Sequence, residues 1–404
     1  MMTVRVCDMI MGSGKTQSAI NLMCKDKNSK YIFITPYLNE VERIKQSCAD
    51  RKFASPQNKG DGKLDNLHYL LSKGENIAST HALFRYYTDE TLSLLRYHGY
   101  KLILDEVFNV VENLNIHKDD IAMLTDEKII GVDEEGRVVR ANNKYQGEFA
   151  SLLETCDTGN VLLYGGKLMI WTFPVKVFEA FSDVIILTYL FDAQIQKYYF
   201  DINNVDIEYI GTKYERGEYQ FCDYPSLPEY AKHLSEKIHI LDDERMNMVG
   251  DDRTALSVSW YERASKAKGK PLIQMLKNNL YNLFRHKFQS GADENMWTTF
   301  KDYRVLLAGK GYTKGFLSYN IRATNNYRCK THLAYCVNVY FNPYMKNYFT
   351  DLGVDVKEDE YALSEMIQWI WRSAIREEND IWVYIPSKRM RTLLIEWLNK
   401  LATN

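Results

Sequence analysis

The chain has 404 residues, of which 46% are hydrophobic and 26% are charged, and 51 basic against 53 acidic residues give a net charge of −2. This length exceeds what one hydrophobic core usually supports, so we expect two domains. The near-neutral charge excludes a protein that binds nucleic acid through a general basic field, and any such site must be a local groove.

Cysteine usage and hydropathy bear on the compartment. Seven cysteines without a Cys-x-x-Cys pair argue against both a disulfide framework and a zinc site, and indicate reduced thiols. No apolar run reaches the ~18 residues of a membrane span, and the chain is expected to start with a strand rather than a signal peptide. We therefore expect a cytoplasmic protein with no membrane partner.

A glycine-rich loop stands between a predicted strand around Val4 and Val6 and a predicted helix from Gln17 to Met23. The loop residues are Gly12, Ser13, Gly14, Lys15 and Thr16. Backbone N–H groups of such a loop can surround a polyphosphate, with Lys15 on the β- and γ-phosphates and Thr16 on Mg²⁺. Met9 stands where the full pattern has its first glycine.

Strands then alternate with helices through the first half. An apolar run from Lys30 to Pro36 predicts a buried strand, and residues 38 to 44 follow with helical spacing. A second strand is predicted at Ile77 to His81, again followed by a helix. This alternation indicates a parallel sheet covered on both faces.

Two adjacent carboxylates end the next predicted strand, which runs from Lys101 to Phe108. Open α/β sheets place their ligands at the carboxyl ends of strands. Asp105 can hold hydrated Mg²⁺ together with Thr16, and Glu106 can orient and deprotonate the water that attacks a γ-phosphate. Together with the glycine loop, these acids predict a nucleotide-hydrolysing site.

Residues 111–160 read as an insertion. Residues 129–139 predict a β-hairpin with an acidic turn. Such a hairpin could be a decoration or a nucleic-acid wedge, and the sequence leaves both open. Buried strands resume at 161–172 and 184–188.

The second half begins after an irregular stretch near 205–250 that contains several Gly and Pro residues. A strand is predicted at Thr254 to Trp260, and a helix opens at Pro271. Further short strands are predicted at 297–300, 315–318, 331–340 and 381–386. This half is therefore a second α/β unit.

Two segments of the second half carry chemistry. The loop Arg322 to Arg328 holds polar and basic residues, among them Asn325, and can be a functional loop or an ordinary basic one. Ala362 to Arg376 has a helical pattern that places Gln368, Arg372 and Arg376 on one face at intervals of four.

The order of these motifs resembles the superfamily-2 helicases and translocases of the DEAD/DEAH-like group. The matching segments are Gly12–Thr16 (motif I), Thr35–Pro36 (Ia), Ser79–His81 (Ib), Asp105–Phe108 (II), Thr188–Tyr189 (a poor motif III), 322–328 (V) and 368–376 (VI). In motif VI, Trp371 replaces a glycine and one residue is added between the arginines. The phrasing of the motifs also resembles helicase-like proteins of bacteriophage.

The resemblance implies an α/β fold of two RecA-like domains, each a mostly parallel sheet flanked by helices, with a β-hairpin-type insertion in the first. The expected boundaries are 1–210 for the first domain, 211–252 for the connection and 253–404 for the second. Arg372 and Arg376, with Gln368, are expected to stabilise charge on the γ-phosphate as an arginine finger, and Arg376 is the preferred finger. No glutamine motif precedes the glycine loop, so the base selectivity is open.

The predicted function is an ATP-dependent nucleic-acid helicase or translocase that uses ATP and Mg²⁺. Single-stranded DNA is the expected track, with RNA as an alternative, and a protein loader or replication partner is considered. Backbone contacts to the strand are assigned to Thr35, Thr80, His81, Thr298 and Asn325. The alternatives are a nucleotide-dependent remodeller or switch that acts on a protein, and a duplex DNA translocase that does not unwind.

Overall fold

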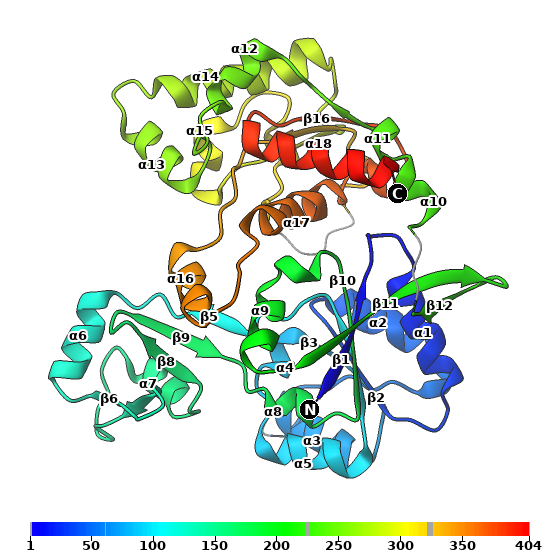
Figure 1. Ribbon diagram of the computed structural model, residues 1–404, viewed down its shortest axis with the longest axis vertical. Coiled ribbons are helices and arrows are strands. Elements are labelled where there is room, and N and C mark those ends of the chain that lie inside the picture. Colours follow the sequence, from blue (N-terminus) through cyan, green and yellow to red (C-terminus); the bar gives the residue numbers. More distant parts are fainter. Residues whose placement is uncertain (1, 61, 224–226, 321–325, 404) are drawn as a thin grey trace. The chain divides into compact units, whose positions relative to one another are not determined.

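The computed structural model describes residues 2–60, 62–223, 227–320 and 326–403. Contacts between Cα atoms divide the chain into two units. The first unit comprises residues 1–8, 15–223 and 342–356, and the second comprises 9–14, 224–341 and 357–404. Figure 1 colours the chain from its N-terminus to its C-terminus.

A seven-stranded sheet forms the centre of the first unit, in the order β12-β11-β1-β10-β4-β2-β3. Its strands are β1 (Thr3–Asp8), β2 (Tyr31–Thr35), β3 (Ile77–Thr80), β4 (Lys101–Asp105), β10 (Asp183–Thr188), β11 (Asp206–Glu215) and β12 (Glu218–Cys222). All neighbouring pairs are parallel except β11 with β12, which form an antiparallel hairpin. β10 lies between the strand of the glycine loop and the strand of the acidic pair.

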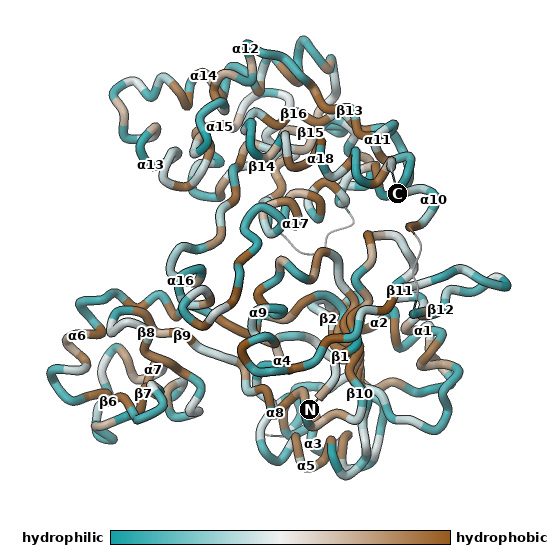
Figure 2. Tube along the Cα trace, viewed as in Figure 1, coloured by the Kyte–Doolittle hydropathy of each residue, from teal (hydrophilic) through white to brown (hydrophobic). Residues whose placement is uncertain are grey.

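The central strands are continuous apolar runs. Every residue of β2 is buried, as are five of the six residues of β10. A parallel strand that is covered on both faces needs such a run, because neither side of it meets water. Figure 2 shows this as hydrophobic colouring along the strands around β1 and β10.

The helices of the first unit connect these strands (Figure 1). They are α1 (Lys15–Lys25), α2 (Leu38–Ser47), α3 (Lys63–Ser72), α4 (His81–Phe84), α5 (Asp89–His98), α8 (Lys176–Glu179) and α9 (Ile195–Ile202). Local sequence sets some of their ends: Thr88 accepts a hydrogen bond from the backbone N–H of Thr91 and starts α5, and Gly99 ends it at φ 62°.

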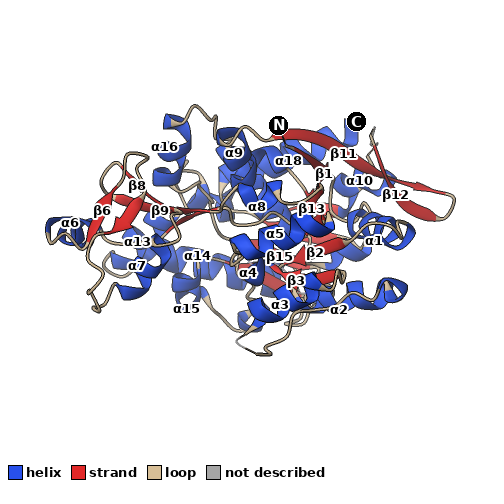
Figure 3. Ribbon diagram, turned by 90° about the horizontal axis from the view of Figure 1, so that it is seen from below, coloured by secondary structure: helices blue, strands red, loops and turns tan. Residues whose placement is uncertain are grey.

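The insertion after β4 has its own small sheets. Its elements are β5 (Val111–Asn113), α6 (Lys118–Asp126), β6 (Ile130–Val132), β7 (Val138–Arg140), α7 (Ala150–Cys156), β8 (Val161–Tyr164) and β9 (Leu168–Thr172). The predicted hairpin is present as the antiparallel pair β6 and β7. Figures 1 and 3 show β6, β8, α6 and α7 grouped together beside the main sheet.

A segment from the second half of the sequence completes the first unit. Its helix, α16 (Pro343–Asp351), begins at an Asn342 cap. The ring of Phe349 lies 5.4 Å from that of Tyr198 on α9, and the ring of Tyr348 lies 5.5 Å from that of Tyr164 on β8. These aromatic contacts hold the segment to the sheet helices and to the insertion.

The second unit has a four-stranded parallel sheet in the order β13-β16-β15-β14. Its strands are β13 (Ile238–Ile240), β14 (Asn295–Thr298), β15 (His332–Tyr335) and β16 (Ile381–Tyr384). Its helices are α10 (Glu229–Lys232), α11 (Leu234–Lys237), α12 (Glu244–Asn247), α13 (Val258–Lys266), α14 (Pro271–Asn282), α15 (Arg304–Leu307), α17 (Glu358–Ile370) and α18 (Lys388–Thr403). Leu276, Leu280 and Trp297 are fully buried in a core between α14 and this sheet.

The predicted α/β class, with mostly parallel sheets flanked by helices, is confirmed. Two predicted strands are wrong. Residues 254–260 lead into the helix α13, and 315–318 form only an isolated bridge between Phe316 and Trp297. The periodicity of a short apolar run does not distinguish a strand from the start of a buried helix. At 254–260 the helix forms because the Ser257 hydroxyl caps α13 by accepting a hydrogen bond from the Trp260 N–H.

Among the described residues, no helix combines the length and apolar character that crossing a bilayer requires.

Truncation of the sheet core should weaken the first unit. Leu104 on β4 has no exposed surface, so Leu104→Ala should lower the free energy of unfolding by about 2–5 kcal/mol through lost burial and a residual cavity. Urea titration followed by far-UV circular dichroism measures this change. The matched control is Val305→Ala on α15, whose side chain is 81% exposed and whose loss should change the value by less than about 0.5 kcal/mol.

Candidate nucleotide site

The glycine loop connects β1 to α1 and ends where the helix starts, at Lys15. Gly12 has φ +86° and Gly14 has φ +81°, values that residues with a Cβ rarely adopt. The Ser13 N–H donates to the Ile10 carbonyl over 3.3 Å, which tightens the turn. Strand, glycine turn and helix N-terminus therefore occur in the order that phosphate binding requires.

Asp105 ends β4 and meets two hydroxyl groups from other elements of the first unit. The Thr16 Oγ1 lies 3.5 Å from Asp105 Oδ1, and the Thr35 hydroxyl donates to Oδ2 over 3.2 Å. The three residues stand at the start of α1 and at the carboxyl ends of β2 and β4. The predicted pairing of Thr16 with Asp105 is thus present as a contact.

Glu106 follows with an unusual backbone. Its φ is +67°, which is uncommon for a residue with a side chain and is found at strained functional positions. Its N–H donates to the Leu187 carbonyl on β10 over 3.0 Å, so the neighbouring strand holds the turn in place. This bend ends β4 directly after Asp105, so the chain leaves the strand direction at the second carboxylate.

Lys15 lies among acidic groups. Burial lowers the pKa of its ammonium, whereas Cys7, Glu106, Asp8 and Asp105 raise it. A buried cation near several acidic groups is suited to a site that binds an anion of higher charge. The position fits the predicted contact with phosphate.

Burial and the charges of Glu106 and Glu40 raise the pKa of Asp105 to about 7, while the hydrogen bond from Thr35 and the charge of Lys15 lower it. The protonated carboxyl is therefore far more favoured here than in an exposed aspartate. A divalent cation would reverse this, because it favours the ionised form. The hydroxyl and carboxylate oxygens present are the donor types that Mg²⁺ prefers, so Thr16 and Asp105 fit the ion.

Two further residues shape this edge of the sheet and were not predicted. Asp8 at the end of β1 accepts a hydrogen bond from the Phe191 N–H over 3.1 Å, and burial raises its pKa. Gln196 on α9 accepts from the Phe108 N–H over 2.7 Å, directly after the acidic pair. Asp8 could have been found as a strand-end carboxylate, but no sequence signal points to Gln196.

The residues predicted to contact nucleic acid have different surroundings. Thr35 is buried and engaged with Asp105, and His81 Nε2 lies 3.1 Å from the Asp105 carbonyl. Thr80 precedes α4 at the end of β3. Thr298 is fully buried at the end of β14, and Asn325 lies outside the described residues. These assignments stay predictions.

The arginine segment differs from its predicted geometry. The helix α17 ends at Ile370, so Arg372 lies in the following turn and Arg376 in a 3-10 helix, η7 (Ala374–Glu377). The predicted continuous helix over 362–376 is therefore wrong, and the two arginines do not share a helix face with Gln368. Ser373, between the two arginines, has an extended backbone with ψ −170° and precedes η7. Gln368 remains on α17, where its amide donates to the Ser364 hydroxyl over 3.3 Å.

Comparison with known proteins gives two matches to family models. Residues 232–398 match the YonV C-terminal Rossmann-like domain, and residues 111–171 match the YonV middle domain. The chain is 44% identical over 411 residues to the SPbeta prophage-derived uncharacterized protein YonV of Bacillus subtilis (strain 168), with 98% of each chain covered.

Two solved structures are similar in fold at low identity. The structure named XPD_Helicase is 12% identical to this chain and superposes with a TM-score of 0.49. The match covers 99% of this chain and 95% of the XPD_Helicase chain. The structure of S. tokodaii Xpd4 is 12% identical and has a TM-score of 0.48. That match covers 97% of this chain and 93% of the Xpd4 chain. Because both TM-scores are below 0.5, these likenesses support no conclusion about this chain.

The raised pKa of Asp105 predicts a pH dependence of metal binding. Mg²⁺ must displace the proton of a carboxyl with a pKa near 7, so Mg²⁺ affinity in the presence of a non-hydrolysable ATP analogue should fall about tenfold from pH 8 to pH 6. Calorimetric titration at each pH measures it. Asp105→Asn should bind Mg²⁺ weakly without this dependence, and Asp119→Asn, at an exposed position on α6, should behave as the wild type. An equal slope in all three proteins would contradict the assignment.

Proposed function

This chain belongs to the YonV family, and we propose that it is an ATP hydrolase that couples Mg²⁺-dependent hydrolysis to movement on nucleic acid, as a helicase or translocase. One observation carries the hydrolase part of the proposal. The hydroxyl of Thr16, next to the phosphate-binding Lys15, lies 3.5 Å from the strand-end carboxylate of Asp105, with Glu106 adjacent. A glycine turn, a buried lysine and paired acids on one sheet edge are the parts that phosphoryl transfer requires.

Each residue of this edge has a role in the proposal. The N–H groups of the glycine loop and the Lys15 ammonium bind the β- and γ-phosphates. Glu106 orients a water against the γ-phosphate and accepts its proton as the oxygen–phosphorus bond forms. Thr16 and Asp105 would hold Mg²⁺, which when bound neutralises charge on the phosphate oxygens.

The second unit would supply a cation to the same reaction. Arg376 is exposed on η7 and Arg372 is half-buried in the turn before it. Either guanidinium could stabilise the charge that develops on the γ-phosphate. We assign the role to Arg376, whose residue is exposed whereas Arg372 is half-buried, and assign Gln368 and Arg372 to supporting contacts.

Single-stranded DNA is the proposed track, and RNA is the alternative. His81 Nε2 lies 3.1 Å from the Asp105 carbonyl, and Thr80 pairs with Thr35 at the carboxyl ends of β3 and β2, so a strand bound at this edge would be coupled to the acidic pair. Hydroxyl and imidazole groups suit contacts to the phosphate backbone without reading sequence. A loader or replication protein would be a further partner.

A protein-directed remodeller is the second candidate, and one observation favours it. The insertion carries more acidic than basic side chains, and the turn between β6 and β7 holds Asp133, Glu134 and Glu135, of which Asp133 and Glu135 pair with Arg137. Such a surface repels nucleic acid and attracts a basic protein. The distinguishing experiment is the ATPase rate with single-stranded DNA, duplex DNA, RNA and no nucleic acid, at low and moderate salt. Stimulation by none of the three would favour the remodeller, and stimulation by duplex without strand displacement would favour a duplex translocase.

Removal of the proposed general base should separate binding from turnover. Glu106→Gln should bind ATP within about threefold of the wild type but lower kcat by about 10²–10⁴, because the attacking water loses its proton acceptor. Lys15→Ala should lose binding as well as turnover. Calorimetry and single-turnover phosphate release measure the two quantities, and Glu75→Gln, an exposed position before β3, is the matched control. Wild-type turnover of Glu106→Gln would overturn the role of this residue.

The arginine assignment is tested in the same assay. Arg376→Ala should lower kcat on the order of 10³-fold with little change in ATP affinity, because a finger acts on charge that develops only in the transition state. Arg263→Ala, at an exposed position on α13, is the control and should leave kcat unchanged. If Arg376→Ala turns over normally and Arg372→Ala does not, the finger role moves to Arg372.

A further inference from the structure

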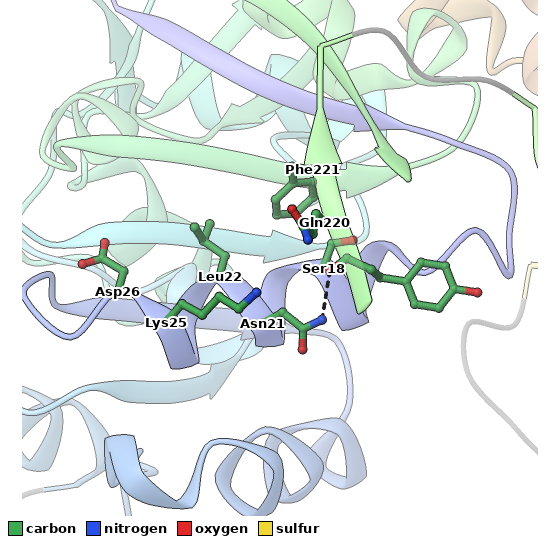
Figure 4. Close-up of a pocket in the computed structure, with 8 residues that line it drawn as sticks. Ser18, Asn21, Leu22, Lys25, Asp26, Gln220 and Phe221 are labelled. Atoms are coloured by element: carbon green, nitrogen blue, oxygen red, sulfur yellow. Dashed lines mark hydrogen bonds between the residues drawn. The ribbon is translucent and has the colours of Figure 1, made fainter. Parts of the chain in front are cut away.

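A cavity lies in the first unit, along the helix that follows the glycine loop. It has a volume of about 440 Å³ and lies between α1 and the edge strand β12. One side is formed by Asp26 and, on α1, by Ser18, Asn21, Leu22 and Lys25, and the β12 side by Tyr219, Gln220 and Phe221. Figure 4 shows the α1 residues spread along the helix, with Gln220 and Phe221 facing them from the strand. This volume is within the range of small-molecule sites.

A polar group in its wall lacks a partner. The Ser18 side chain is 1% exposed, and its hydroxyl has no hydrogen-bond partner among the described residues. The half-buried Gln220 lines the same cavity from the strand side. An unpaired buried hydroxyl costs free energy, so a ligand that supplies partners would be bound with a gain.

The charges of the cavity are already neutralised within the protein. Lys25 forms an ion pair with Glu218, and Asp26 accepts from the Lys101 ammonium over 3.0 Å and from the Tyr31 hydroxyl over 2.8 Å. The cavity therefore offers no free charge to an anion or a cation. Its remaining features are amide and hydroxyl groups beside the apolar Leu22 and Phe221, which suit a neutral planar ring with hydrogen-bonding edges.

A polar track joins the cavity to the phosphate loop. The Gln17 amide donates to Asn21 Oδ1 over 3.0 Å, and the Asn21 amide donates to the Tyr219 carbonyl over 2.9 Å. Asn21 follows Thr16 by five residues, a distance of about 7.5 Å along a helix axis. A base attached through ribose to the α-phosphate can span this distance.

We infer that this cavity binds the purine base of the nucleotide whose phosphates the glycine loop holds, with Ser18, Asn21 and Gln220 as its hydrogen-bonding groups. The inference rests on the proposed function, and it assigns base recognition to the β11–β12 hairpin rather than to residues upstream of β1. Loss of one hydrogen bond to the base should then weaken nucleotide binding without affecting the phosphate contacts.

The test compares ATP with inorganic tripolyphosphate, both with Mg²⁺, by calorimetry on the full chain. Ser18→Ala and Gln220→Leu should each weaken ATP binding about three- to tenfold and leave tripolyphosphate binding within twofold. Leu22→Trp, which fills the cavity, should weaken ATP to the affinity of tripolyphosphate. Gln274→Leu on α14 is the matched control and should change neither ligand. Thermal melts show whether each variant is folded. If Leu22→Trp is unstable, Ser18→Ala still tests the inference, because it removes only one hydroxyl oxygen.

Other outcomes decide between the two proposals. If the wild type binds neither ATP nor tripolyphosphate, the proposed ATP hydrolase fails. If it binds both, but all cavity variants bind ATP as the wild type does, only the base assignment fails. Free adenosine gives the last arm: competition with ATP supports a base site, whereas binding of adenosine together with ATP would show a separate effector site and overturn the inference.

Discussion

The carboxylate of Asp105 is the point on which the candidate site depends. It accepts a hydrogen bond from the Thr35 hydroxyl and lies 3.5 Å from the Thr16 hydroxyl. One carboxylate therefore links β4, β2 and the first turn of α1. Parallel strands bring their carboxyl ends to one edge of a sheet, and this makes such a meeting feasible for residues about ninety positions apart. The metal and water chemistry proposed here needs that edge.

The pKa values of Asp105 and Lys15 at this edge of the sheet suit a site that binds a charged ligand. Burial raises the pKa of the Asp105 carboxyl and lowers the pKa of the Lys15 ammonium. Burial therefore disfavours the charged form of both groups. In the proposed function, a phosphate and its metal would supply the opposite charges together, which would couple the binding of the two. The αL backbone of Glu106 is a local strain that the bond to Leu187 maintains.

Helix α1 connects this site to the cavity proposed for the base. Its first residue is Lys15, the proposed phosphate contact, and its next turns carry Ser18 and Asn21 along the cavity wall. The opposite wall is β12, whose hairpin with β11 extends the same sheet beyond β1. In the proposal, the Lys15 contact to phosphate and the recognition of the base would thus use the same helix.

The sequence by itself determined the parts of the fold that have a local pattern. The glycine loop, the buried strands at 31–35, 77–80 and 101–105, and the acidic pair were all predictable, because strand, turn and helix signals are contained within a few residues. Local pattern was not enough at 254–260, where Ser257 starts a helix, or at 371–376, where α17 has already ended at Ile370 and Ser373 precedes a 3-10 helix. In both segments the apolar residues are compatible with either conformation, and burial and capping made the choice.

Only the tertiary structure decided the contacts between distant segments. The pairing of β11 with β1, the packing of α16 on the first unit, the bond from the Phe191 N–H to Asp8 and the bond from the Phe108 N–H to Gln196 have no counterpart in sequence periodicity. Each joins residues that are far apart in the chain, and a hydrogen bond or an aromatic contact leaves no repeating trace along it. The glycine loop can therefore be recognised from the sequence alone. The residues that surround Asp105 and Glu106, and those that line the adjoining cavity, come together only once the sheet has assembled.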